Sequence, residues 1–348
     1  MRVTVPLMTA FVALAGVALA PSNPAHAAAP LNIRVGWVVM SGDMAPLVFA
    51  KPDILKHDGK TYTVEPVHFK GTSPQLEALA ANQIDIASLA YSSFSFGIEN
   101  AHLNDMRIIA DGFQDGHPGY ASIDYMVRNG SGINKVQDLK GKVLGVNVIG
   151  AAVDIGARAE LAKYGLHYPG DYSIIEAPFP AIGAMLLEGK ADVVSLPPPF
   201  NYGPEVEKGA HTLFTMHDGL GTSQIIILVA REGFLKAHPK ALDDFFDDLV
   251  RGTHWMLNPA NRQAAIQFVA KESHQPAAMF EPYYLTRKDE YRDPSDIPDL
   301  AALQRNIDTE VKFGFLKHSF DVKKYADLSF VERAAKHYAA EEKTASAK

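Results

Sequence analysis

Residues 138–200 begin Asp-Leu-Lys-Gly-Lys-Val-Leu-Gly-Val-Asn-Val-Ile-Gly-Ala-Ala-Val-Asp and end, from residue 188, Glu-Gly-Lys-Ala-Asp-Val-Val-Ser-Leu-Pro-Pro-Pro-Phe. Near the start of this stretch a short apolar run of strand type, residues 142–147, is followed by a small-residue loop, residues 148–153. Helical spacing follows over residues 154–164, carried by Ile155, Ala159 and Ala162. The order strand, loop, helix predicts one half of a ligand-binding cleft.

The loop after this strand meets the amino terminus of the helix, where free backbone N–H groups and the helix dipole favour a negatively charged group. Gly150, Ala151 and Ala152 keep that approach open because their side chains are small. The same residues are also typical of a tight connection that binds nothing. On these residues alone both interpretations stand.

The amino terminus has the pattern of a secretory signal peptide. Arg2 precedes an apolar core over residues 7–20, and Ala25-His26-Ala27 fits the A-x-A cleavage rule. A membrane anchor is the alternative, but spanning a bilayer takes roughly 20 apolar residues, which is more than this core contains. We therefore expect residues 1–27 to be removed and the mature chain to begin at Ala28.

The mature chain is acidic. It has 32 Lys and Arg against 40 Asp and Glu, so we expect no nucleic-acid partner. No stretch after the signal peptide is long and apolar enough to cross a bilayer, so no membrane anchor is expected. The chain has no cysteine, which excludes disulfides, thiolate metal sites and the lipidated cysteine that tethers some exported proteins. We expect a monomer that diffuses freely in the periplasm and carries no cofactor.

The order of elements in the first part of the mature chain recurs about 110 residues later. Residues 33–37, 61–69 and 84–89 are of strand type, and Ser73 and Pro74 suit the cap and first position of a helix after the second strand. The recurrence has offsets of 109, 111 and 107 residues. It pairs Gly36 with Gly145, Val64-Glu65 with Ile175-Glu176, and Ile84-Asp85-Ile86 with Ala191-Asp192-Val193. The repeat predicts two similar α/β lobes.

Two β-rich stretches, residues 120–127 and 223–229, could cross between the lobes as paired hinge segments or be ordinary strands within one lobe. From Pro239 onward the apolar spacing is helical, and we expect this region to pack on the first lobe. The first lobe then comprises residues 28–121 and 228–340, and the second comprises residues 122–227. Residues 341–348 are small and charged and are expected to be disordered.

Motifs for catalysis or metal binding are absent from the sequence. It has no Gly-x-Ser-x-Gly, no phosphate-binding Walker loop and no His-Glu-x-x-His, and its 13 histidines lack metal-ligand spacing. Small and polar residues instead follow several predicted strands, where open α/β sheets bind ligands. In the first lobe the candidate ligand contacts are Ser41, Gly42, Asp43, Met44, Gly71, Thr72, Ser73, Tyr91 and Ser92. In the second lobe they are Asn147, Gly150, Ala151, Ala152, Pro198 and Phe200.

The order and spacing of several segments resemble the nitrate/sulfonate/taurine-type, or NMT1-like, family of periplasmic solute-binding proteins that serve ABC importers. The segments are Gly71 with residues 76–81 and 84–86, residues 138–142 with Gly145-Val146, and residues 186–192. The resemblance covers nearly the whole mature chain. It implies a two-lobed periplasmic-binding-protein fold of type II, with two hinge crossings and a ligand cleft between the lobes. It also implies a small-molecule ligand and two partners, the permease and ATPase subunits of an importer.

One departure from the family bears on the ligand. Sulfonate binders of the family often have a hydroxyl residue just after the glycine at position 150, whereas this chain has Ala151. The candidate loops contain Asp43 and Asp154 but no Arg or Lys. We interpret Asp154 as a first-turn acid that matches the helix dipole, and Asp43 as a partner for a cationic or N–H group.

These observations predict capture of a small organic anion or zwitterion for import, without catalysis. A sulfonate, taurine, a carboxylate or a related nitrogen or sulfur compound fits that class. Three alternatives remain open. They are binding of a pyrimidine-type or other heterocyclic vitamin precursor, an enzyme of the related pyrimidine-precursor synthase type, and a module that presents its ligand to a membrane sensor.

Overall fold

The computed structural model describes residues 29–346 together with Met1. The expected signal peptide and its cleavage site therefore lie outside the described residues. Within residues 29–346 no helix is both long and apolar enough to cross a membrane.

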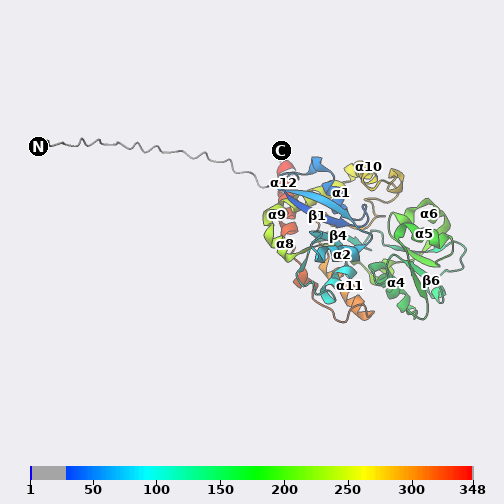
Figure 1. The fold of residues 1–348 in the computed structure, drawn as a ribbon. Helices are drawn as coiled ribbons and strands as arrows, with labels where there is room; N and C mark the ends of the chain where they lie inside the picture. The colour runs from blue at the N-terminus through cyan, green and yellow to red at the C-terminus, as the bar shows by residue number, and fades with distance from the viewer. Residues whose placement is uncertain (2–28, 347–348) are drawn as a thin grey trace.

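The described chain forms two five-stranded sheets, and we call the parts that carry them the first and second lobes (Figure 1). The strand order is β2-β1-β3-β10-β4 in the first sheet and β7-β6-β8-β5-β9 in the second. The strands of the first sheet are β1 (Leu31–Trp37), β2 (Tyr62–His68), β3 (Ile86–Ala90), β4 (Met106–Asp115) and β10 (Ser223–Arg231). Those of the second are β5 (Asp124–Arg128), β6 (Val143–Val146), β7 (Ser173–Glu176), β8 (Val193–Leu196) and β9 (Ala210–Thr215).

The two sheets have the same topology, as the sequence repeat predicts. Each has three parallel strands, then a strand that runs antiparallel to both of its neighbours, then the last strand. The matched aspartates also play the same part in each lobe. Asp85 accepts the Arg34 N–H at 2.9 Å, and Asp192 accepts the Val143 N–H at 2.9 Å, so each fixes the neighbouring strand. The expected pair of similar α/β lobes is confirmed.

Helices fill most of the connections between the strands. In the first lobe these are α1 (Met44–Phe49), α2 (Thr72–Ala80), α3 (Tyr91–Glu99), α8 (Glu232–Ala237), α9 (Pro239–Leu257), α10 (Arg262–Ser273), α11 (Leu300–Lys312) and α12 (Ser329–Ser346). In the second they are α4 (Ala152–Lys163), α5 (Phe179–Leu187), α6 (Pro204–Gly209) and α7 (Met216–Leu220). Short 3-10 helices are η1 (Pro52–Ile54), η2 (Val136–Leu139), η3 (Phe200–Tyr202), η4 (Pro259–Asn261), η5 (Ala277–Met279) and η6 (Val322–Tyr325).

Helices lie on both faces of the first sheet. The evidence is that consecutive residues of β10 belong to different hydrophobic clusters. Leu228 is in a cluster with Phe245 of α9, whereas Ile227 is in a cluster with Phe94 of α3. A strand that is covered on both faces needs apolar side chains on both. This requirement accounts for the unbroken apolar run from Ile225 to Ala230.

The chain crosses between the lobes twice, in the segments between β4 and β5 and between β9 and β10. Of the stretches considered as hinge strands, residues 223–229 lie within a sheet strand, and residues 120–127 divide into the end of the first crossing, residues 120–123, and the start of β5. β5 pairs with β8 and β9 in the second sheet, and all of β10 pairs within the first sheet. The expected boundary between residues 227 and 228 is therefore wrong, because it would divide β10.

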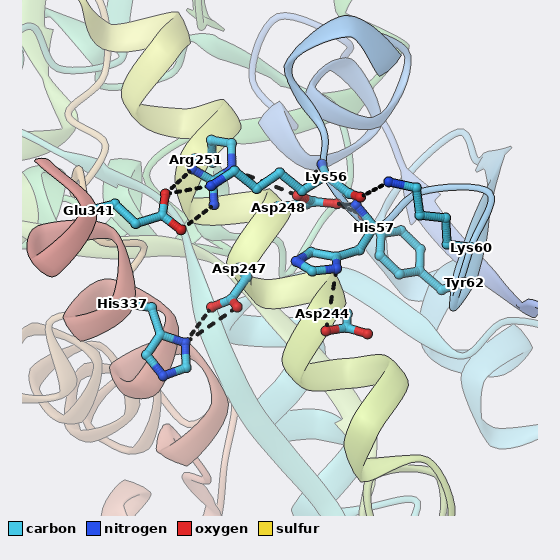
Figure 2. A network of polar contacts seen from close by, with 10 residues as sticks. All are labelled: Lys56, His57, Lys60, Tyr62, Asp244, Asp247, Asp248, Arg251, His337 and Glu341. Atoms are coloured by element: carbon cyan, nitrogen blue, oxygen red, sulfur yellow. Dashed lines mark hydrogen bonds and ion pairs between the residues drawn. The ribbon is translucent and has the colours of Figure 1, made fainter. Parts of the chain in front are cut away.

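The helical region after Pro239 packs on the first lobe, as its apolar spacing predicts (Figure 1). A buried carboxylate, Asp248 of α9, is central to this packing (Figure 2). It accepts hydrogen bonds from the Lys56 N–H at 2.8 Å, the His57 N–H at 2.8 Å and the Tyr62 hydroxyl at 2.7 Å. These bonds join α9 to the segment that leads into β2.

The last turns of α12 are also part of this contact (Figure 2). Glu341 pairs with Arg251 of α9 and with Lys56, each at 2.7 Å. These hydrogen bonds with Arg251 and Lys56 lower the pKa of Glu341 to about 2. The expectation of a disordered tail is wrong for residues 341–346, because they continue the helix and Glu341 is paired.

Candidate ligand-binding site

A cavity of about 110 Å³ lies between the two sheets, and we call it the central cavity. Its lining comes from both lobes. The first lobe contributes the segment after β1, the start of α2 and part of β4, and the second contributes the segments after β6 and β8. In both lobes the parallel strands present their carboxyl ends here, where open α/β sheets bind ligands.

Eight of the sequence-predicted contacts line the central cavity. They are Gly42, Asp43, Gly71, Thr72, Asn147, Ala151, Ala152 and Pro198. Segments more than 100 residues apart in the chain are thus brought together as the repeat predicts. Whether these residues contact a ligand stays a prediction.

Three other predicted residues, Ser73, Ser92 and Gly150, face a neighbouring cleft of about 450 Å³. We call it the outer cleft; it lies between α2, α3, the β6–α4 segment and the end of α11. Ser73 is not the helix cap that the sequence suggested, because α2 begins at Thr72 and Gly71 takes the cap position without a side-chain bond. The helix therefore turns Ser73 away from the central cavity.

The remaining four predicted residues lie in the structure around the central cavity and do not line it. Ser41 is buried, and its carbonyl accepts a hydrogen bond from Arg292 at 2.9 Å. Met44 belongs to a hydrophobic cluster beneath α1. The Tyr91 hydroxyl donates to the Ala152 carbonyl at 3.4 Å, which links the two lobes. Phe200 stacks on Phe179, with ring centroids 5.8 Å apart.

Asp43 is a buried carboxylate in the cavity wall. It accepts the Val38 and Val39 N–H groups at 2.8 and 3.0 Å and the Ser88 hydroxyl, so it holds the segment after β1 in place. Burial nevertheless raises the pKa of Asp43. The carboxylate has a structural role, and it also makes this wall of the cavity acidic.

Glu290 is a second acidic group in the wall, and the sequence analysis did not select it. Its carboxyl is buried beside Asp289, and both pair with Arg292, at 3.4 and 3.0 Å. Burial and the adjacent Asp289 charge raise the pKa of Glu290 well above its usual range. The raised pKa favours the uncharged form of Glu290, so Arg292 balances Asp289, and the Glu290 carboxyl can both accept and donate a hydrogen bond.

Asn147 provides an unused hydrogen-bond acceptor from the second lobe. Its Oδ1 atom is buried and has no partner within residues 29–346. A buried carbonyl oxygen without a partner costs free energy, which a donor group of a ligand would recover. Asn147 lines the central cavity, but its Oδ1 atom has almost no exposed surface, so a ligand would reach this acceptor only after the side chain turns.

Two helix amino termini, those of α2 and α4, also meet the central cavity. Their first N–H groups have no partner within the helix and favour an acceptor or an anion. Asp154 in the first turn of α4 accepts the Gly150 N–H at 2.8 Å and pairs with Arg158 at 2.8 Å. Asp154 therefore has the structural role that the sequence suggested, and it does not line the cavity.

The rest of the lining is mostly apolar, and the sequence analysis did not select these residues, except that Val153 and Pro197 lie in loops it placed at the cleft. It includes Val38, Val39, Ala90, Phe113, Ile123, Val153, Phe179, Pro197, Ile225 and Ile226. Among residues 29–346, no lysine or arginine lines the cavity. Its chemistry suits a small molecule with an apolar surface, a group that donates hydrogen bonds, and an acceptor or anionic group at the helix termini.

Such a cavity between two similar α/β lobes joined by two crossings defines the two-lobed periplasmic-binding-protein fold, and solved structures agree. The alkanesulfonate-binding protein SsuA from Xanthomonas axonopodis pv. citri, bound to MOPS, matches with a TM-score of 0.68, 18% identity and coverage of 86% of this chain and 99% of that one. The periplasmic nitrate-binding protein NrtA from Synechocystis PCC 6803 matches with a TM-score of 0.70, 14% identity and coverage of 88% and 89%. These likenesses show the fold.

The model of the NMT1-like family matches residues 26–270, and the chain belongs to that family. No curated protein matches the chain. The same fold also occurs in the desulfurization enzyme DszB, which matches with a TM-score of 0.64, 14% identity and coverage of 88% of this chain and 99% of that one. The fold therefore serves both binding and catalysis, and function has to be argued from the site.

Proposed function

We propose that this protein is the periplasmic solute-binding subunit of an ABC importer. It captures a small organic solute in the central cavity and delivers it to a membrane permease. The observation that carries the proposal is the shared lining, since each lobe supplies both polar groups and apolar surface to one cavity. A ligand that contacts both lobes stabilises their closed arrangement, and a permease can recognise that arrangement.

The polar groups of the lining favour a zwitterion over a simple anion. The Asp43 and Glu290 carboxyls can accept hydrogen bonds, and no lysine or arginine among the described residues lines the cavity. A ligand ammonium or other N–H group fits these acceptors. An acidic end fits the amino termini of α2 and α4, with the Thr72 hydroxyl beside it. An aminoalkanesulfonate or an amino acid has both ends.

Mass spectrometry of the small molecule that is released when the purified protein is denatured tests the class of ligand. We expect a compound with both an amino and an acidic group. Calorimetric titration with the identified compound, followed by its recovery, separates binding from catalysis. Recovery of a chemically altered compound would overturn the assignment as a binding protein, and a ligand without any N–H group would overturn the zwitterion.

Thr72 and Ser73 provide a matched pair of variants, because Thr72 lines the central cavity and Ser73 lines the outer cleft. Both hydroxyls lie within hydrogen-bonding distance of the Ser93 hydroxyl, at 2.7 and 3.4 Å, so loss of that contact is common to the two variants. Thr72→Ala should weaken binding by about 1.5 to 3 kcal/mol if its hydroxyl bonds to a charged group of the ligand. Ser73→Ala should leave affinity nearly unchanged. Calorimetry on both variants decides this, and equal affinities for Thr72→Ala and wild type would remove Thr72 from the site.

Export and closure follow from the same proposal. The mature protein should begin at Ala28 and be recovered from the periplasm by osmotic shock, as amino-terminal sequencing can show. Full-length protein that pellets with membranes would contradict this.

Addition of the ligand should reduce the radius of gyration in small-angle scattering, because two crossings permit hinge closure. Light scattering should find a monomer in both states.

A further inference from the structure

The outer cleft adjoins the central cavity. Ala151 lines both spaces, and along α2 the lining passes from Thr72 in the central cavity to Ser73 in the outer cleft. The outer cleft has a volume of about 450 Å³ against about 110 Å³ for the central cavity. Of the two adjoining spaces, the outer cleft is therefore the larger, and it lies outside the polar site proposed for the central cavity.

Exposed apolar side chains are concentrated in the outer cleft. Among the described residues, six large hydrophobic side chains are exposed, and three of them line this cleft. They are Phe96 of α3, with 54% of its surface exposed, and Val148 and Ile149 of the β6–α4 segment, with 39% and 42%. Because these side chains come from opposite lobes, they form two apolar lips that face one space. Such a concentration of apolar surface indicates a binding partner.

The floor of the outer cleft contains a buried acid, Glu310 of α11. Its residue is only 2% exposed, and its Oε2 atom has no hydrogen-bond partner among the described residues. Burial raises the pKa of Glu310 to about 8, so the group is largely uncharged at neutral pH. A neutral carboxyl can lie beside an apolar group of a ligand, and it can also form a hydrogen bond with a polar atom of that ligand.

We propose that the outer cleft binds the apolar tail of the same solute whose polar head occupies the central cavity. The ligand is then an amphiphile, with a small head that bears charged or N–H groups and an alkyl or aryl tail. This inference rests on the proposed function, and it names a narrower class of substrate. The tail is the favoured occupant because the cleft adjoins the central cavity at Ala151, which lines both, and because both lobes contribute its lips.

The fluorescent apolar probe N-phenyl-1-naphthylamine tests the outer cleft directly with the full chain. We expect one molecule to bind per protein, and Phe96→Ser and Ile149→Ser each to weaken binding about tenfold, since each removes apolar contact area. Tyr164→Ser is the matched control, because Tyr164 is also an exposed hydrophobic residue, at 44%, but does not line the cleft. Absence of binding, or equal affinity in wild type and both cleft variants, would overturn the proposal.

Displacement of the probe by N-butyl-, N-hexyl- and N-octyltaurine tests whether one molecule reaches both spaces. We expect affinity to rise about fourfold for each added methylene in wild type, and less steeply in Phe96→Ser. A flat series, or no displacement even by the octyl compound, would refute the tail assignment. N-octyltaurine should compete better than octan-1-ol. If the two compounds compete equally, the zwitterionic head contributes nothing to affinity. That result would overturn the zwitterion of the proposed function and leave the tail assignment standing.

A second copy of the chain is the competing occupant of the apolar lips. Light scattering on wild type and Phe96→Ser distinguishes the two cases. The tail assignment requires wild type and variant to have the same monomeric mass. A wild-type dimer that the substitution dissociates would assign the lips to an interface between copies and overturn the proposal.

Discussion

Asp115 is a buried carboxyl at the end of β4, where the chain leaves the first sheet for the second. It accepts hydrogen bonds from the Ile123 N–H and the Ser122 hydroxyl, both at 2.6 Å. Ile123 in turn lines the central cavity. Burial raises the pKa of Asp115 to about 7, and the nearby Asp124 charge adds to the rise. The first crossing between the lobes is thus held by a group that titrates near neutrality.

The sign of the pH effect follows from the two pKa values of Asp115. Its folded pKa of about 7 lies above the ordinary value of 3.8, so the folded protein holds this proton more tightly than the unfolded chain does. Its contribution to the free energy of unfolding therefore falls as pH rises from about 4 to about 7 and then levels off. The difference between the two pKa values corresponds to roughly 4 kcal/mol of the free energy of unfolding in total. About 2.5 kcal/mol of this contribution is lost between pH 5 and pH 8.

We expect Asp115→Asn to remove this pH dependence, because the amide has the same shape, does not ionise and still accepts the Ile123 N–H. Urea unfolding of both proteins from pH 5 to pH 8 measures the effect. The stability of the variant relative to wild type should rise by about 2.5 kcal/mol over this range. Other buried carboxyls cancel in the difference, including Asp111, whose pKa burial also raises to about 7.

A stability difference between Asp115→Asn and wild type that stays constant with pH would refute the reasoning. Asp115→Ala is the control for the hydrogen bonds. It leaves the buried Ile123 N–H without its acceptor, so it should destabilise the protein by about 1 to 3 kcal/mol even at pH 5, where Asp115→Asn should not.

Three further substitutions test the packing around the site. Arg292→Met should lower the free energy of unfolding by about 3 to 5 kcal/mol, because it leaves the buried Asp289 carboxyl without its partner; a loss below about 1 kcal/mol in urea unfolding would contradict this. Gly252→Ala should cost about 1 to 3 kcal/mol, since a Cβ there would lie 2.1 Å from a side chain of α1, whereas Gly233→Ala, with no atom within 4 Å, should be nearly neutral in the same assay. Glu341→Ala should lower the melting temperature by only a few degrees at low salt and by less at high salt, because it removes partly exposed ion pairs; an unchanged effect at high salt would exclude them as its cause.

The elements that the sequence predicted well are those with strong local periodicity. The strand expected at residues 142–147 is β6, and the helix expected at residues 154–164 is α4, within two residues at each end. The hinge strands were not predictable in this way. An apolar β-rich run such as residues 223–229 has the same pattern in a crossing segment and in a central strand, and only its pairing with β3 and β4 distinguishes the two.

In the candidate site, too, some residues could be predicted from local sequence patterns and others could not. Residues in the loops that follow repeated strands, such as Asp43, Thr72 and Asn147, were found because parallel strands place their carboxyl ends together. Glu290 and Phe113 were missed. Glu290 lies in a segment without a helix or strand between η5 and α11, and Phe113 lies within β4, so no loop after a parallel strand marks either residue. A charged stretch such as Asp289 to Arg292 usually indicates a solvated surface, whereas here the fold buries it.

By itself the sequence determined two α/β lobes of one topology, an acidic chain without cysteine, and the loops in which a cleft would lie. These follow from periodicity, composition and an internal repeat, all of which are local or additive properties of the chain. Only the tertiary structure decided which loop residues line the central cavity, that Glu290 joins them there, and that a cleft with exposed apolar side chains adjoins it. The physical reason is that burial depends on how segments far apart in the chain pack together, as where Arg292 donates to the Ser41 carbonyl 251 residues away. The local pattern of a sequence does not show which distant segments meet.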